Sequence, residues 1–283
     1  MSSGPAGQVT GSSYRPPLET PPRTRLRRSL HTVDGVTIDA AYEPGTRPSG
    51  DSAMGSNDVV IVVAHGFTGD LDRPHVRRAA AVLARHAAVV TFSFRGHGAS
   101  GGSSTVGDRE VHDLAAAVAW ARELGHTRVA TVGFSMGGSV VLRHAALSDA
   151  RTDAVVDAVV SVSAPARWYY RGTAPMRRLH WLVTRPVGRA IGRYGLRTRI
   201  HHRDWDPVPA SPVESVPLIA PTPLLIVHGD QDGYFPLDHP RMLAAASGDH
   251  AELWIEPGMG HAEHAADDAL LGRIGEWAAA AAG

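Results

Sequence analysis

The stretch RVATVGFSMGGSVVLRHAAL, residues 128–147, decides how the rest of the sequence is interpreted. Residues 128–132 form a short, mostly β-branched run that is typical of a buried strand, and residues 139–146 fit a helix. Between them, residues 133–137 match the pattern G-x-S-x-G with Ser135 at the centre. Such a turn needs small residues on both sides because the serine backbone is strained and the two elements pack closely. The stretch therefore predicts a nucleophilic serine directly after a strand.

The same pattern occurs a second time, centred on Ser100. Residues 95–99 separate Ser100 from the nearest strand-like run, and more glycine and serine follow it, so a loop is expected there. For Ser135 the competing interpretation is a glycine-rich turn that contains a serine by chance. The strand-like run before Ser135 and the helix-like run after it favour Ser135 as the nucleophile.

Short apolar runs alternate with alanine-rich, helix-compatible stretches along the chain. The strand-like runs occupy residues 59–64, 89–94, 129–132, 155–162, 223–227 and 252–255. The helix-like stretches occupy residues 74–86, 108–124, 136–147, 240–246 and 267–282. Continuous apolar runs are typical of strands buried on both faces, and helices between such strands imply crossovers in a parallel sheet. The predicted fold is α/β, a mostly parallel central sheet flanked by helices, with an antiparallel hairpin around Asp34-Gly35 at its N-terminal edge.

Two segments fall outside this alternation. Residues 1–28 are rich in Ser, Gly, Pro and Arg and lack the apolar segment of a secretory signal, so we expect a disordered tail before one domain over residues 29–283. Residues from about 165 to 222 contain no strand-like run but hold half of the six tryptophans and half of the six tyrosines. Their apolar residues recur at helical spacing with a break at Pro186. This insertion is expected to be a helical lid or binding element.

The composition excludes several classes of function. The chain has 283 residues, a formal net charge of zero, no cysteine and no lysine. These absences exclude disulfides, thiolate metal sites, cysteine nucleophiles, lysine Schiff bases and the Walker phosphate loop. No apolar run reaches the ~18 residues that a membrane span needs. We expect a cytoplasmic enzyme with no cofactor, no metal ion, no nucleic-acid partner and no stable membrane insertion, and the oligomeric state stays open.

A serine nucleophile needs a base within hydrogen-bond reach and an acid that orients the base. The run at 223–227 leads into HGDQD, residues 228–232. A carboxylate beyond the carboxyl end of a strand lies on the edge where α/β sheets bind ligands. Asp232 is therefore the preferred acid, and Asp230, which is nearer the strand, is expected to cap the turn.

The base is sought after the last strand-like run, at 252–255. That run leads through a glycine turn to His261, which would reach the same sheet edge as Asp232. The chain has 16 histidines, so a single histidine is weak evidence by itself. His264 is the nearest competitor, but it lies one turn into an expected helix start, and His261 is preferred.

The oxyanion formed during acyl transfer needs hydrogen-bond donors. The run at 59–64 ends in HGFTG, residues 65–69, and the backbone amide of Phe67 in this loop would pair with that of Met136, directly after the nucleophile. His65 is expected to have a structural role in holding the loop.

The order Ser135, Asp232, His261, each after its own strand, resembles that of the α/β-hydrolase superfamily over nearly all of the chain from about residue 29. The motifs that carry the resemblance are AHGFTG at 64–69, FRGHGAS at 94–100, GFSMGG at 133–138, HGDQD at 228–232 and GMGH at 258–261. Within the superfamily, the sequence looks most like the serine-aminopeptidase-like group, which includes monoacylglycerol lipases and cinnamoyl esterases. The resemblance implies an α/β-hydrolase fold, this catalytic triad and Phe67 and Met136 as oxyanion donors.

The insert is unusually basic. Between residues 164 and 203 it contains ten arginines and no acidic residue. Arginine pairs well with carboxylate and phosphate, so the insert could recognise an anionic group, although a solvated basic face balanced by the acidic remainder explains the same pattern. Its aromatic residues Trp168 and Tyr169, together with Tyr234, are the candidate substrate-binding residues.

These observations leave three functions to weigh. The leading one is a serine hydrolase that cleaves small to medium acyl esters through an acyl-enzyme intermediate. The second is an acyl-CoA thioesterase or acyltransferase that uses the arginine-rich insert for an anionic group. The third is a catalytically silent hydrolase fold that only binds a ligand. Peptidase activity is compatible with the group resemblance, but no subsite for a peptide terminus is recognisable.

Overall fold

The computed structural model describes residues 24–46, 58–148 and 154–283. Within them one eight-stranded sheet has the order β1-β2-β4-β3-β5-β6-β7-β8. Its strands are β1 (Leu26–His31), β2 (Thr37–Glu43), β3 (Val59–Ala64), β4 (Ala88–Phe92), β5 (Arg128–Phe134), β6 (Ala158–Val162), β7 (Leu224–Gly229) and β8 (Ala251–Glu256). β2 is antiparallel to both of its neighbours, whereas every neighbouring pair from β4 to β8 is parallel. The predicted sheet is confirmed, including the hairpin at its N-terminal edge.

The predicted boundary of the N-terminal tail is wrong by a few residues. β1 begins at Leu26, and Arg27 and Arg28 pair with Ala41 and Ala40 of β2. The side chain of Arg27 also forms ion pairs with two aspartates on neighbouring segments. Consecutive arginines on an exposed edge strand have the composition of a tail, which is why the sequence pattern misplaced the boundary. The rest of the expected tail, residues 1–23, lies outside the described residues.

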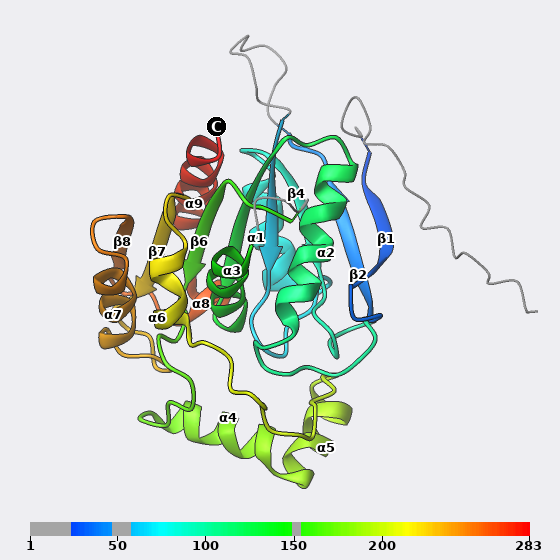
Figure 1. Cartoon of the computed structure of the whole chain (residues 1–283), viewed down its shortest axis with the longest axis vertical. Coiled ribbons are helices and arrows are strands. Elements are labelled where there is room, and N and C mark those ends of the chain that lie inside the picture. The colour runs from blue at the N-terminus through cyan, green and yellow to red at the C-terminus, as the bar shows by residue number, and fades with distance from the viewer. Residues whose placement is uncertain (1–23, 47–57, 149–153) are drawn as a thin grey trace, which may run out of the picture.

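Helices cover both faces of the sheet (Figure 1). Alternate residues of β3 point to opposite faces, as the strand geometry requires. Val60 and Val62 belong to a core with α2 (Glu110–Glu123) and α3 (Met136–Leu147), whereas Ile61 and Val63 belong to a second core with α1 (Pro74–Leu83) and α9 (Asp268–Ala281). All six residues of β3 are buried, which explains its continuous apolar sequence.

The insert lies between β6 and β7 and contains helices rather than strands. Its elements are α4 (Ala174–Thr184), α5 (Pro186–Gly195), α6 (Pro212–Ser215) and the short 3₁₀ helix η1 (Val216–Leu218). The break expected at Pro186 is where α5 begins, since proline fits the first turn of a helix. Figure 1 shows α4 and α5 together beyond one end of the sheet.

Two further helices follow the insert: α7 (Asp238–Ala246) and α8 (Ala262–Ala265). No helix in the described parts of the chain is long and apolar enough to cross a membrane.

The packing of α2 provides a test of the first core. Leu114 is fully buried in it, whereas Leu147 at the end of α3 is 65% exposed. Leu114→Ala should lower the free energy of unfolding by about 2–5 kcal/mol because it removes apolar contacts and leaves a cavity. Leu147→Ala, the same chemical change at the surface, should lower it by less than about 0.5 kcal/mol. Urea denaturation of the two variants measures the difference, and equal losses would contradict the assigned core.

Candidate active site

The loops that carry the candidate residues all leave the sheet at one edge. Because β3, β5, β6, β7 and β8 are parallel, their carboxyl ends lie side by side. The pairs at the strand ends are Ala64 with Gly133, Phe134 with Val162, Val162 with Val227, and Gly229 with Glu256, so neighbouring strands end within about two residues of each other. The residues that follow each strand therefore meet even though they are distant in sequence.

Ser135 lies in a sharp turn between β5 and α3. Its φ of 52° is in the left-handed region, which a non-glycine residue occupies only where its surroundings hold it there. A Cβ at Gly133 would overlap the backbone of Gly137, and a Cβ at Gly137 would overlap the backbone of Ala64. The small residues expected around the serine are thus required by the close packing of strand and helix.

Ser135, His261 and Asp232 form one hydrogen-bonded series. Nε2 of His261 lies 2.9 Å from Oγ of Ser135, and Nδ1 of His261 lies 2.7 Å from Oδ2 of Asp232. A carboxylate only accepts, so Nδ1 carries the proton and Nε2 is left to accept the hydroxyl proton of Ser135. The side chain of Asp232 is fully buried and that of His261 is 16% exposed. The three residues selected from the sequence are thus within hydrogen-bond reach of one another.

The surroundings of Asp232 keep its carboxyl ionised. Burial by itself raises the pKa of Asp232, but the hydrogen bond with His261 and those donated by the backbone N–H groups of Phe235 and Tyr234 outweigh it, so the pKa lies below its usual value. Asp230 is exposed and accepts a hydrogen bond from the backbone N–H of Gly258 at 2.7 Å. Asp230 therefore links the two loops after β7 and β8 rather than contacting His261.

The other competing residues have separate structural contacts. Oγ of Ser100 donates to the carbonyl of Ser93 at 2.6 Å and accepts from the N–H of Asp39 at 2.9 Å, so this serine joins a loop to β2. Ser100 lies in a loop, as predicted. His264 lies against His75 of α1, with ring centroids 3.7 Å apart.

His65 holds the loop that carries Phe67. It is fully buried; Nδ1 donates to the carbonyl of Gly66 at 2.7 Å, and Nε2 accepts from the N–H of Phe94 at 3.0 Å. Burial lowers the pKa of His65 to about 3, so the imidazole is neutral at ordinary pH. These contacts are those of the structural residue expected from the sequence.

A cavity of about 590 Å³ opens at the end of this site. Ser135 lines it together with Phe67 and Met136, the two candidate oxyanion donors. Helix α4 of the insert contributes an apolar side whose members were expected only as a helical pattern: Met176, Leu179 and Val183. The apolar spacing in the sequence was the signal for this face, but nothing in it indicated that the face lines the same cavity as Ser135.

The candidate substrate-binding residues lie in two different places. Trp168 and Tyr169 line the cavity, and Nε1 of Trp168 donates to the carbonyl of Pro209 at 2.9 Å, which fixes its ring. Tyr234 is not among the residues that line this cavity within the described chain, and its contact with substrate stays a prediction. Its ring stacks on that of His261 instead, with centroids 4.3 Å apart and planes 26° apart. Tyr234 therefore packs against the base because both loops converge behind it.

Comparisons with known proteins agree with this geometry. A family described as the alpha/beta hydrolase fold matches residues 59–177. The chain is 27% identical to a monoacylglycerol lipase of Mycolicibacterium smegmatis, over 84% of this chain and 90% of that one. An esterase of Pyrococcus furiosus superposes with a TM-score of 0.69 at 21% identity, covering 92% of this chain and 94% of that one. Est1E of Butyrivibrio proteoclasticus, solved with ferulic acid bound, gives a TM-score of 0.56 at 20% identity, covering 87% and 96%.

The chain has the α/β-hydrolase fold. The proteins that it resembles include a lipase and an esterase.

The cavity of this hydrolase carries more positive than negative groups. Arg167, Arg171 and Arg203 line it, against the single carboxylate of Asp204 among its lining residues in the described chain. Arg167 forms an ion pair with Asp238 at 2.8 Å, while Arg171 and Arg203 are exposed to solvent. Part of the basic insert therefore faces the site.

Because the imidazole of His65 is buried and neutral, the free energy of unfolding should fall at acid pH. The pKa of His65 is about 3 in the folded state and about 6.5 in the unfolded chain, so folding disfavours the charged form. Its contribution to stability is therefore complete above about pH 6.5 and is lost as the pH falls toward 3. Between pH 7 and pH 5 the free energy of unfolding should fall by about 2 kcal/mol through His65 alone.

His65→Gln should reduce this pH dependence in urea denaturation by about that amount, whereas His31→Gln, which alters an exposed histidine of β1, should leave it unchanged. Identical pH profiles for His65→Gln and the wild type would contradict the prediction.

Proposed function

We propose that this α/β hydrolase is a serine esterase that cleaves small to medium acyl esters with Ser135 as nucleophile, His261 as base and Asp232 as orienting acid. The observation that carries the proposal is the hydrogen-bonded series from Oγ of Ser135 through His261 to the buried carboxylate of Asp232, with steps of 2.9 and 2.7 Å. A hydroxyl is a poor nucleophile at neutral pH unless such a base removes its proton.

The reaction follows from these contacts. Oγ of Ser135 attacks the acyl carbonyl while Nε2 of His261 takes its proton, and Asp232 stabilises the imidazolium that forms. The backbone N–H groups of Phe67 and Met136 are assigned to the oxyanion. His261 then gives its proton to the departing alcohol, and water, activated by the same histidine, hydrolyses the acyl-enzyme.

The size and the polarity of the cavity fit a small to medium acyl group. Its volume of about 590 Å³ lies within the range of sites for small molecules, and the α4 side is apolar. The names of two similar proteins, a monoacylglycerol lipase and an esterase with ferulic acid bound, point to acyl chains and cinnamoyl-type acids as the substrates to test first. Within the superfamily we assign the chain to the group that holds monoacylglycerol lipases and cinnamoyl esterases.

Replacement of the nucleophile tests the proposal. Ser135→Ala should lower kcat for a short acyl ester by about a thousandfold or more without unfolding the protein, because no other group can form the acyl-enzyme. Ser100→Ala, at the centre of the second G-x-S-x-G match, is the matched control and should keep most of the turnover, since Oγ of Ser100 hydrogen-bonds to the backbone of Ser93 and Asp39. Steady-state kinetics on the folded variants provide the measurement. Equal turnover of wild type and Ser135→Ala would refute the role of Ser135.

Labelling with a fluorophosphonate separates the esterase from a catalytically silent fold. An activated Ser135 should react with the reagent stoichiometrically, and Ser135→Ala should not react. A folded wild type that does not react would favour the silent, ligand-binding alternative.

A second candidate activity is an acyl-CoA thioesterase or acyltransferase. The exposed Arg171 and Arg203 at the cavity favour it, because guanidinium groups pair with phosphate through charge-assisted hydrogen bonds. The same nucleophile would attack a thioester carbonyl, and the anionic part of the substrate would lie toward the insert.

Charge removal in the insert tests this second activity. Arg171→Gln and Arg203→Gln should lower kcat/KM for an acyl-CoA by about three- to tenfold and leave that for a neutral ester with the same acyl group unchanged. Arg178→Gln is the matched control, because Arg178 is exposed on α4 and is not among the cavity-lining residues of the described chain. The preference for the acyl-CoA should also weaken as salt is raised. Parallel losses for both substrates would rule out a specific anion site.

A further inference from the structure

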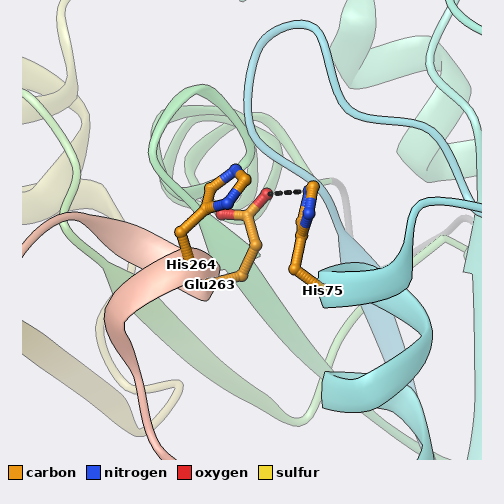
Figure 2. A group of neighbouring side chains, drawn as sticks. All are labelled: His75, Glu263 and His264. Atoms are coloured by element: carbon orange, nitrogen blue, oxygen red, sulfur yellow. Dashed lines mark ion pairs between the residues drawn. The ribbon is translucent and has the colours of Figure 1, made fainter.

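Three side chains outside the proposed triad converge on one another (Figure 2). His75 comes from the first turn of α1, and Glu263 and His264 are neighbours in α8. One ligand atom from each residue lies within 4.8 Å of the other two, and the two imidazole rings have centroids 3.7 Å apart. We call these three residues the His75 cluster. The triad as proposed uses none of them.

The carboxylate of Glu263 is buried, and within the described residues it forms no ion pair with an arginine. Its side chain is 3% exposed, and Oε1 accepts a hydrogen bond from the backbone N–H of Gly66 at 3.1 Å. Nε2 of His75 lies 3.8 Å from the same Oε1, too far for a hydrogen bond, and this nitrogen is buried without a hydrogen-bond partner within the described residues. A buried carboxylate and a buried ring nitrogen thus face each other across a gap.

The neighbouring arginines are engaged elsewhere. Arg78 donates to the backbone carbonyls of Glu263 at 2.9 Å and Ala266 at 2.6 Å, and not to the Glu263 carboxylate. Arg73 forms an ion pair with Asp70 at 3.3 Å. Burying a carboxylate is costly unless a positive charge compensates it, so the cluster provides a place for a cation.

We propose that His75, Glu263 and His264 bind one divalent transition-metal ion, with Zn²⁺ as the ion that this donor set fits. Two imidazole nitrogens and one carboxylate oxygen are ligands that Zn²⁺ prefers, whereas Mg²⁺ and Ca²⁺ prefer sites made of oxygen alone. The ion would fill the gap between Nε2 of His75 and Oε1 of Glu263 and satisfy both atoms. His264 is exposed, so the fourth position is open to water.

The geometry allows this with small side-chain movements. Zinc bonds of about 2.0–2.2 Å place tetrahedral ligand atoms about 3.3–3.5 Å apart. The ligand atoms of the cluster, within 4.8 Å of one another, need to approach by up to about 1.5 Å. His264 can supply most of this movement by rotating about its side-chain bonds, because it is exposed.

Calorimetric titration of the full chain with Zn²⁺ in a non-chelating buffer tests the proposal. The wild type should bind one Zn²⁺ per chain with a Kd in the micromolar range or below, and His264→Ala should weaken this at least tenfold. His264 is the first choice for substitution because its side chain is exposed and its loss should not disturb the fold. His75→Ala and Glu263→Gln should weaken binding in the same way, and the glutamine can still accept the hydrogen bond from Gly66.

His31→Ala is the matched control, since His31 is exposed on β1 and is not part of the cluster. It should bind Zn²⁺ as the wild type does. Zn²⁺ should also raise the Tm of the wild type and of His31→Ala but not that of His264→Ala, because an ion that binds only the folded state stabilises it.

Three results would overturn the proposal. These are no stoichiometric Zn²⁺ binding by the wild type, equal affinity of His264→Ala and the wild type, or equal affinity of the wild type for Mg²⁺.

Discussion

The tight turn at Ser135 is the constraint on which the rest of the site depends. The serine keeps a φ of 52° because α3 approaches β5 and β3 so closely that only glycine fits at Gly133 and Gly137. This turn directs Oγ away from the sheet, toward the loops that follow β7 and β8. The hydrogen bond from Ser135 to His261 exists only because these strands are parallel and neighbouring strands end within about two residues of each other.

The cavity is built from two parts, the loops at the strand ends and the insert. The loops at the strand ends are held by buried polar contacts, such as those of His65 with Gly66 and Phe94. The insert instead supplies the cavity side formed by α4, together with the aromatic ring of Trp168 and the cavity-lining arginines. The groups of the proposed chemistry therefore lie at the sheet edge, whereas much of the cavity lining comes from the insert.

The loop after β8 contributes to two neighbouring groups of side chains. His261 faces Ser135, and two residues later Glu263 turns toward Gly66 and His75. Gly66 precedes Phe67, the proposed oxyanion donor, so the buried carboxylate of Glu263 also supports the loop of the site. A cation beside Glu263 would therefore lie one hydrogen bond away from the backbone that carries this donor.

The sequence by itself determined two kinds of feature: those set by neighbouring residues, and those that follow a recognisable strand in chain order. The strand-like runs, the hairpin at Asp34-Gly35 and the break at Pro186 are set by neighbouring residues, so composition and spacing revealed them. Ser135, Asp232 and His261 could be selected because each follows a recognisable strand. The start of β1 was misplaced because charged edge strands and tails have the same composition.

Contacts between distant segments were decided only by the tertiary structure. The insert's apolar pattern could not indicate that α4 lines the same cavity as Ser135, and the stacking of Tyr234 on His261 depends on how two loops pack together. Glu263 meets Gly66 across 197 positions and faces His75 of α1, a pairing that no local pattern encodes. Sequence periodicity reports which face of an element is buried, whereas the identity of the side chain that it meets is set by the packing of the whole domain.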